Sequence, residues 1–119
     1  MEAPLRILQV YPKDDYFTGA AIQLRELTTG LKGRGHEVVV ATRPSETWAT
    51  KLREAGIPHY ALPMKSEVDL ASVRYLVRIL RRHRIQVVHA QKGKARTLAM
   101  IAGLVTRIPS AIVGGGGIV

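Results

Sequence analysis

Two kinds of apolar pattern alternate along the chain, and this alternation constrains the fold more than any other feature. Short apolar runs, several rich in β-branched residues, are separated by stretches in which apolar residues recur every three or four positions. The first pattern is typical of buried strands and the second of amphipathic helices. The predicted strands cover residues 5–10, 36–42, 57–62, 85–89 and 110–113. The predicted helices run from Ala20 to the Gly33-Arg34-Gly35 stop signal, from the cap Ser45 to Gly56, from the cap Asp69 to Arg84, and over residues 95–107.

Strands that alternate with helices through short connections predict a parallel sheet with helices on both faces. The 119 residues suffice for one such domain, so the predicted fold is a single doubly wound, Rossmann-like α/β domain with a sheet of about five strands. Right-handed crossovers favour the strand order 3-2-1-4-5. In such a sheet ligands bind at the carboxyl ends of the strands, where the order reverses between the first and fourth strands. The loops over residues 11–19 and 89–94 are therefore the expected site.

Each predicted helix is expected to bury one face against the sheet. The positions expected on these faces are Ala20, Leu24, Leu27 and Leu31, then Trp48, Leu52 and Ala55, then Leu70, Val73, Val77 and Leu80, and finally Leu98, Ile101 and Val105. The third strand is expected near an edge of the sheet, because Pro58 and Pro63 cannot donate hydrogen bonds to a neighbouring strand.

Composition excludes several classes of protein. Apolar residues make up 46% of the chain and charged residues 23%, which is too apolar for a disordered chain. The chain has no cysteine, so a disulfide framework is excluded and a cytoplasmic location is expected. We find neither a signal peptide nor a transmembrane segment in the sequence. The four histidines show no metal-ligand spacing, so no metal site is expected. They are His36, His59, His83 and His89.

Positive charge is concentrated in the second half of the chain. Residues 1–64 carry 8 basic and 7 acidic side chains, whereas residues 65–119 carry 10 and 2. Such a surface attracts anions, or it simply keeps the protein soluble. Five arginines lie on or just after the third helix, where the helix dipole stabilises cations without a ligand. The functional alternative is contact with the acidic inner face of a membrane. They are Arg74, Arg78, Arg81, Arg82 and Arg84. Only 5% of residues are aromatic and no nucleic-acid-binding module is visible, so nucleic acid is not an expected partner.

Two segments could carry chemistry. Gly19, in the loop before the first helix, would let backbone amides approach a phosphate at the helix amino terminus, although a single glycine there favours a plain helix start. His89 ends the fourth strand, where it could donate, accept or transfer a proton, or be a buried structural histidine. Lys92, Lys94 and Arg96 lie at or just before the first turn of the next helix, where the dipole disfavours cations. This indicates an anion recruited from outside the chain, and a solvated turn is the alternative.

Several segments resemble the amino-terminal domain of glycosyltransferase family 4, whose fold is called GT-B. The segments are Arg6–Val10, Thr18-Gly19-Ala20, Leu27–Val38 with its Leu-x-x-x-Gly-His-Glu-Val sequence, Ala55–Pro58, Val87–Ala90 and Arg107–Pro109. Their order and spacing follow the family pattern over nearly the whole chain. The chain has Ala20 and Gln91 where the family usually has a second glycine and the second histidine of a His-x-His segment.

The resemblance implies a half of a two-domain enzyme. In the family the amino-terminal domain mainly holds the acceptor, a carboxyl-terminal domain holds the nucleotide sugar, and transfer usually retains the anomeric configuration, commonly without a metal. Residues 1–119 would then be the acceptor-side domain, inactive alone, with no cofactor. The implied catalytic residue is His89, and the expected substrate-binding residues, from the resemblance and the basic cluster together, are Thr18, Gly19, Ala20, Gln91, Lys92, Gly93, Lys94 and Arg96.

The expected partners are a nucleotide-sugar donor, mainly through the other domain, and an anionic or phosphorylated acceptor, with peripheral membrane contact as a further expectation. Two alternatives stay open. The chain could be a stand-alone binding module or one subunit of a two-chain transferase. It could also be a nucleotide-binding oxidoreductase domain, against which the missing Gly-x-Gly-x-x-Gly counts.

Overall fold

The computed structural model describes residues 4–65, 69–90 and 111–114, and within them the elements follow the predicted alternation. The strands are β1 (Arg6–Tyr11), β2 (Glu37–Thr42), β3 (His59–Ala61), β4 (Val87–Ala90) and β5 (Ala111–Gly114). The helices are α1 (Gly19–Gly33), α2 (Glu46–Glu54) and α3 (Leu70–Arg82). The helix predicted over residues 95–107 lies outside the described residues.

The five strands form one parallel sheet in the order β3-β2-β1-β4-β5, which confirms the predicted topology. β1 is the central strand of the sheet. On one side it pairs with β2, and on the other it pairs with β4, where Gln9 lies opposite His89. The chain leaves β1 toward one edge of the sheet and β4 toward the other. The carboxyl ends of β1 and β4 therefore border the predicted ligand site.

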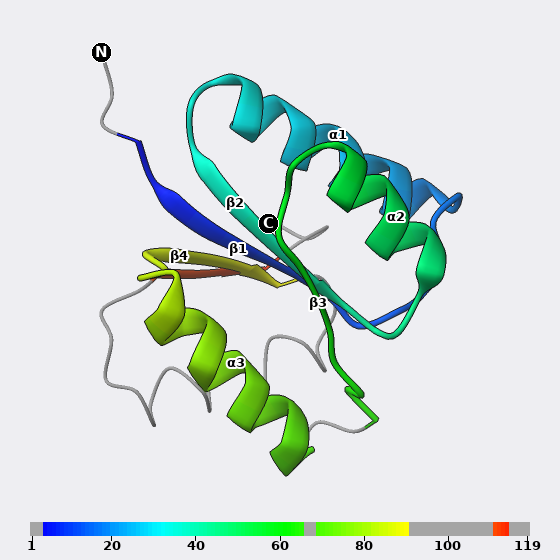
Figure 1. Cartoon of the computed structure of the whole chain (residues 1–119), viewed down its shortest axis with the longest axis vertical. Helices are drawn as coiled ribbons and strands as arrows, with labels where there is room; N and C mark the ends of the chain where they lie inside the picture. The colour runs from blue at the N-terminus through cyan, green and yellow to red at the C-terminus, as the bar shows by residue number, and fades with distance from the viewer. Residues whose placement is uncertain (1–3, 66–68, 91–110, 115–119) are drawn as a thin grey trace.

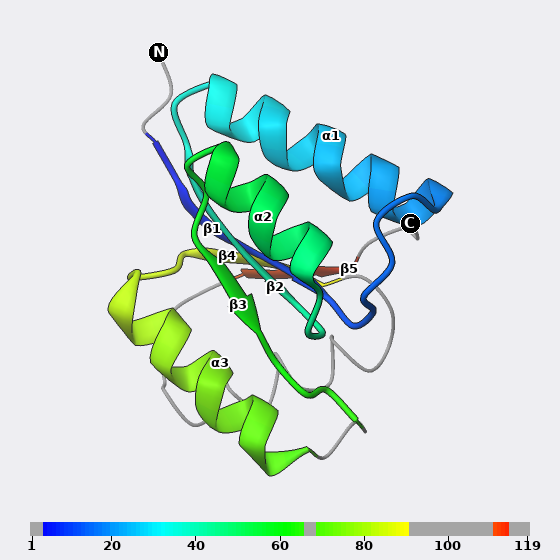
Figure 2. The ribbon, with the colours of Figure 1, turned by 45° about the vertical axis from the view of Figure 1, so that its right-hand side comes forward.

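Helices cover both faces of the sheet. Figures 1 and 2 show α1 and α2 on one face and α3 on the other. Successive side chains of a strand point to opposite faces, so β1 contributes to two separate cores. The core under α3 includes Leu8, Val10, Val39, Leu76, Leu80 and Val88, and the core under α1 and α2 includes Tyr11, Leu24, Val38, Val40, Trp48 and Leu52.

Side chains and glycines fix the ends of the helices. An oxygen at each amino terminus accepts a hydrogen bond from the first turn, which satisfies an amide that the helix leaves without a partner. The pairs are Thr18 with Ala21, Ser45 with Trp48, and Asp69 with Ser72, so the predicted caps Ser45 and Asp69 are confirmed. Gly35 and Gly56 follow α1 and α2 with φ of +92° and +74°, in the left-handed region that glycine adopts most readily.

Some predicted core positions are wrong. Leu27 is 41% exposed and Leu70 is 74% exposed. In α1 the residues that face the sheet are Ala21, Leu24 and Thr28, so the buried face includes a small and a polar residue and leaves Leu27 on the flank. Leu70 is the first residue of α3, and the helix reaches the core only from Ser72 and Val73 onward. Ala55 is exposed too, since it lies after the last turn of α2.

Strand boundaries also differ from the prediction at several ends. Leu5 is 39% exposed and precedes β1. The run over residues 57–62 forms a ladder only over His59–Ala61, with Pro58 and Pro63 on either side, and it lies at the edge as predicted. Both prolines lack the amide proton that would extend the ladder.

Candidate functional site

The carboxyl ends of β1 and β4 bring His89 beside Gln9. The two residues lie opposite each other in the parallel ladder, and the distance from His89 Nδ1 to Gln9 Oε1 is 2.5 Å. An amide oxygen can only accept, so in this arrangement Nδ1 is the donor and Nε2 carries the lone pair. Burial lowers the pKa of His89, because the charged imidazolium is poorly solvated there. A neutral imidazole with a fixed tautomer can therefore accept a proton or hydrogen bond through Nε2.

Gln9 is fully buried, and its Nε2 has no hydrogen-bond partner among the described residues. A buried donor without a partner costs free energy, whereas Oε1 of the same amide accepts from His89 Nδ1. The role that the contacts indicate is to hold the imidazole of His89 in one orientation. The sequence analysis missed Gln9, although a polar residue inside the apolar run Leu8-Gln9-Val10 was the available signal.

A hydrogen-bonded network joins the end of β1 to the start of α1. Tyr11 Oη donates to Asp15 Oδ1 at 2.8 Å and lies 3.4 Å from Thr18 Oγ1. Thr18 Oγ1 in turn accepts from the amide of Ala21 at 3.3 Å. Burial raises the pKa of the Asp15 carboxyl, but the hydrogen bonds with Thr18 and Tyr11 outweigh it, so the net pKa is lowered and the carboxylate is favoured. The network fixes the position of the helix amino terminus relative to the strand.

An aromatic cluster holds the loop before α1 against α2. Trp48 is 1% exposed, donates from Nε1 to the carbonyl oxygen of Asp15 at 2.7 Å, and packs edge-on against Tyr16 at 4.8 Å between ring centroids. The guanidinium of Arg25 lies 4.0 Å above the centre of the Tyr16 ring and donates to the Tyr16 carbonyl oxygen. Phe17 packs edge-on against Tyr16 and is 75% exposed. The loop is thus positioned by the buried Trp48 and the partly buried Tyr16, while Phe17 faces outward.

The structure brings together some of the predicted site residues. Thr18 caps α1, and Gly19 and Ala20 are its first two residues, at the same rim of the sheet as His89. The amides of Ala21 and Ile22 are taken by Thr18, whereas an α-helix offers no partner of its own to the amides of its first two residues. These two amides can serve an anion. The remaining predicted residues lie outside the described part of the chain: Gln91, Lys92, Gly93, Lys94 and Arg96.

Other expectations concern the carboxylates and the histidines. Asp14 is exposed whereas Asp15 takes part in the network, so the adjacent carboxylates do not face one site, as expected. Within residues 4–65, 69–90 and 111–114, no three histidine or acidic side chains gather as a metal site would need. Among the described helices, none combines the length and apolar character needed to cross a bilayer.

Comparison with protein families identifies the chain. The sequence model of the glycosyl transferase 4-like domain matches residues 18–113, which is most of the chain and includes β2, β3 and β4. The chain belongs to this family. The expected family resemblance is therefore confirmed. No curated protein matches the chain.

Solved structures confirm the fold of this glycosyl transferase 4-like domain. A glycosyltransferase from Rickettsia africae matches with a TM-score of 0.74 and 17% identity over 95% of this chain and 30% of that one. MurG from Acinetobacter baumannii matches with a TM-score of 0.68 and 15% identity over 93% and 35% of the two chains. HepE from Anabaena, in complex with UDP, matches with a TM-score of 0.69 and 20% identity over 92% and 29%. The chain thus spans about a third of the length of these proteins.

Proposed function

We propose that this domain is the acceptor-binding half of a retaining glycosyltransferase, which transfers a sugar from a nucleotide-sugar donor to an anionic acceptor. The acceptor would be a glycan, a lipid or a small molecule. Family membership supports the reaction class. The observation that carries the proposal is the common position of His89 and the α1 amino terminus at the strand-order reversal, where open α/β sheets bind ligands. The other half of the cleft, and most of the donor site, would come from a carboxyl-terminal domain.

The amino terminus of α1 would face the donor diphosphate. Its first two amides and the positive end of the helix dipole favour an anion there. Gly19 has ordinary backbone geometry, and a Cβ built on it would meet no atom within 4 Å. The fold itself therefore does not require glycine at this position, which supports a ligand that approaches the backbone closely.

His89 would act on the acceptor. Its neutral imidazole, with the lone pair on Nε2, could take a hydrogen bond or proton from an acceptor hydroxyl group. Gln9 would keep the ring in the orientation that presents Nε2, and so would be a positioning residue.

The central test is sugar transfer by the full-length protein. A panel of nucleotide sugars and acceptors should reveal transfer, and His89→Asn should lower kcat by about a hundredfold or more if the imidazole moves a proton. Residues 1–119 expressed alone should show none. Full-length protein that transfers no sugar from any donor would contradict the proposal. An open reading frame that continues past Val119 would exclude the alternative of a stand-alone module or separate subunit.

Gly19→Ala separates a ligand role from a structural one. Stability should hold, since the added methyl group meets nothing, whereas KM for the donor should rise about tenfold or more as the methyl group blocks close approach. Gly30→Ala is the matched control: Gly30 lies in the same helix, is exposed, and its Cβ would also meet nothing. Equal donor KM in the two variants would remove Gly19 from the site.

The basic cluster is proposed to orient the anionic acceptor. The double change Lys92→Glu and Lys94→Glu should weaken acceptor binding in the full-length protein by about tenfold or more, while the fold stays intact. Lys51→Glu with Arg53→Glu, on the exposed side of α2, removes the same charge elsewhere and should leave acceptor binding unchanged. Unchanged acceptor affinity in the Lys92→Glu, Lys94→Glu variant would show that the cluster is solvated surface and does not bind the acceptor.

A peripheral contact with an acidic membrane, at its cytoplasmic face, is the second part of the proposal. On the outer face of α3, Arg74 and Arg78 lie around Tyr75, which is 46% exposed, and Leu70 adds an apolar side chain at the start of the helix. Arginines beside exposed apolar groups suit an anionic bilayer. Cosedimentation with phosphatidylglycerol vesicles should fall in Leu70→Ser with Tyr75→Ser, but not in the control Ile22→Ser on α1. Equal vesicle binding by the parent protein, the double variant and the Ile22→Ser control would contradict the membrane contact.

A further inference from the structure

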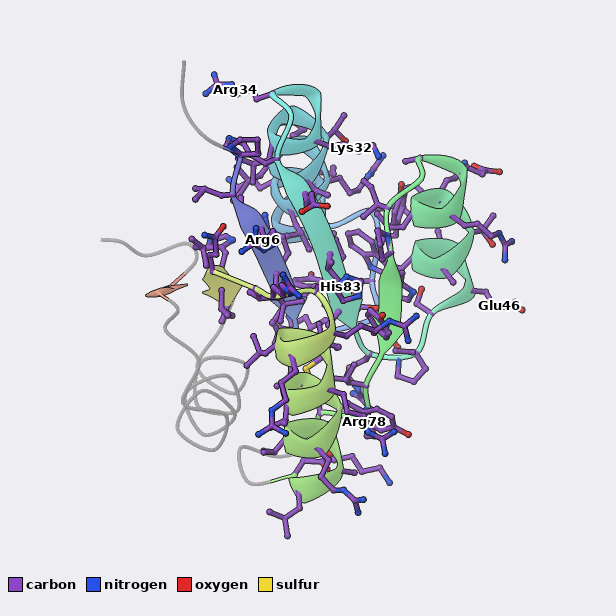
Figure 3. All side chains as sticks on the ribbon, turned by 60° about the vertical axis from the view of Figure 1, so that its left-hand side comes forward. Arg6, Lys32, Arg34, Glu46, Arg78 and His83 are labelled. Carbon is purple, nitrogen blue, oxygen red and sulfur yellow. The ribbon has the colours of Figure 1, made fainter. Side chains whose placement is uncertain are left out.

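A second hollow lies at the opposite end of the sheet from His89, where the strands begin. Its volume is about 610 Å³, in the range of small-ligand sites. Its walls come from the starts of β1 and β2, from the segments that precede β3 and β4, and from the end of α1. The basic side chains that line it are Arg6, Lys32, His36, Arg82, His83 and Arg84, and among the described lining residues Glu37 is the only acidic one. Figure 3 labels Arg6 on β1, Lys32 on α1 and His83 directly after α3, which lie around this end of the sheet.

Helix dipoles explain part of this charge. The carboxyl ends of α1, α2 and α3 all meet this rim, and each carries about half a negative charge. Two of the cations serve carbonyl groups there: Arg6 Nε donates to Arg84 O at 2.7 Å, and Lys32 Nζ donates to Gly56 O at 3.2 Å. The four arginine and lysine side chains and Glu37 together carry a net charge of +3. This exceeds the negative charge of the three helix ends by about one to two units. The hollow therefore has positive charge that the fold does not use.

The backbone conformation of Arg84 also supports a ligand in this hollow. In the described part of the chain, three helix-to-strand turns reach this rim, and the first two place Gly35 and Gly56 in the left-handed region. The third turn places Arg84 there, with φ of +51°. A residue with a side chain is less stable than glycine in this conformation, so folding alone would favour glycine at position 84. Arg84 lines the hollow, and its carbonyl oxygen accepts a hydrogen bond from Arg6 Nε.

We propose that this hollow binds the phosphate or pyrophosphate group of a small soluble ligand, at a site separate from the proposed transfer cleft. Guanidinium groups match phosphate oxygens in charge and in planar, two-pronged geometry. Arg6 and Lys32 position the site from β1 and α1, and Arg82 and Arg84 add charge from the end of α3. The proposal does not depend on sugar transfer, since none of these residues lies at the His89 rim.

A flat bilayer would supply the same phosphate chemistry through lipid headgroups, and neighbouring residues distinguish the two sources. Arg81 and Arg82 are both exposed on the last turn of α3, but only Arg82 lines the hollow. A ligand inside the hollow therefore needs Arg82 and not Arg81. A bilayer would use both, because it cannot enter the hollow.

The test is a titration of the ¹⁵N-labelled full-length protein with inorganic pyrophosphate, followed by amide chemical shifts. Glu37 and Gly56 report on the hollow, whereas Gly19 and Ala20 report on the cleft. We expect saturable shifts at Glu37 and Gly56 with a Kd of about 1 mM or tighter. Arg84→Gly should weaken this binding about tenfold while the unfolding midpoint stays level or rises. Arg82→Gln should weaken it about threefold or more, and Arg81→Gln by less than about twofold.

Three outcomes would overturn the proposal. One is shifts confined to Gly19 and Ala20, which would place pyrophosphate in the cleft alone. Another is an equal loss in Arg81→Gln and Arg82→Gln, which would indicate general attraction to a basic surface. The third is a response of Glu37 and Gly56 to phosphatidylglycerol vesicles but not to pyrophosphate, which would assign the surface to lipid headgroups.

Discussion

The two ends of the sheet differ in how they handle charge, and the direction of the chain explains the difference. Each crossover helix runs against the strands, so the helices begin at the carboxyl rim, beside His89, and end at the amino rim, beside Arg6. The first rim therefore has free helix amides, and its buried side chains Tyr11, Gln9 and Trp48 make the hydrogen bonds there. The second rim has carbonyl groups to satisfy, and it does so with cations.

This comparison predicts where each rim is vulnerable. The carboxyl rim is held by buried side chains, so substitutions there should cost stability. The amino rim is held by exposed cations on carbonyl groups, whose individual contributions are small. Four measurements would break or sharpen the contrast.

The largest effect is expected from Trp48→Ala. The substitution removes a buried indole that packs against Tyr16 and holds the carbonyl group of Asp15, so we expect a loss of about 3–5 kcal/mol in the free energy of unfolding. Urea denaturation measures it. Trp48→Phe keeps most of the ring and loses the hydrogen bond, so it should cost clearly less. A loss below about 1 kcal/mol in Trp48→Ala would show that the loop is not held from α2.

A smaller effect is expected from Tyr11→Phe. The phenol ring stays buried, but Asp15 loses the hydroxyl group that donates to it at 2.8 Å. The expected cost is about 0.5–1.5 kcal/mol, measured in the same denaturation experiment. The control is Tyr75→Phe on the exposed face of α3, which should change the unfolding free energy by less than about 0.5 kcal/mol. Equal effects would mean that the network does not stabilise the fold.

The sequence predicted the sheet better than the rims, for a physical reason. The local pattern of apolar residues reveals the alternation of strands and helices. The fixed handedness of the crossovers then limits the possible strand orders. The hydrogen bond between Gln9 and His89 depends on the register of β1 against β4, and residues 80 positions apart carry no local signal of that register. Leu27 and Leu70 were misplaced because apolar character was used as the measure of burial, whereas Thr28 and Ser72 occupy buried positions.

The candidate site was predicted in part for the same reason. Gly19 and His89 could be placed at one rim from topology alone. The aromatic cluster of Trp48, Tyr16 and Phe17 could not, because it joins the loop after β1 to a helix that follows β2. Neither could the basic hollow, which gathers residues from five separate segments of the chain.

At the amino rim, replacing Arg84 should raise stability. Arg84→Gly relieves a left-handed conformation, for an expected gain of about 0.5–1 kcal/mol, reduced by the greater freedom of glycine in the unfolded chain. Gly56→Ala, at the equivalent turn with φ of +74°, should instead lose about 1 kcal/mol. Thermal unfolding of both variants measures the pair. A loss in Arg84→Gly would show that the Arg84 side chain stabilises the fold, and would weaken the ligand interpretation of its conformation.

The smallest effect is expected from pH, because the imidazoles concerned are only partly buried. Burial lowers the pKa of His59, His83 and His89 from the usual 6.5, with Arg82 also lowering and Glu37 raising that of His83. Between the folded and unfolded pKa values the unfolded chain binds more protons, so folding stability is fully present above about pH 6.5 and declines as the pH falls below it. Urea midpoints at about pH 7.5 and 5.5 measure the decline.

His89→Asn and His83→Asn divide that decline between the two rims. Each variant should flatten the pH profile by removing one group that resists protonation, and the change in His89→Asn reports on the imidazole beside Gln9. Since an asparagine can still donate to Gln9 Oε1, the variant removes the titration while it keeps a partner for the buried amide oxygen. A profile as steep in His89→Asn as in the parent protein would mean that the imidazole is solvated at the rim, and Gln9 would then have no neutral ring to orient.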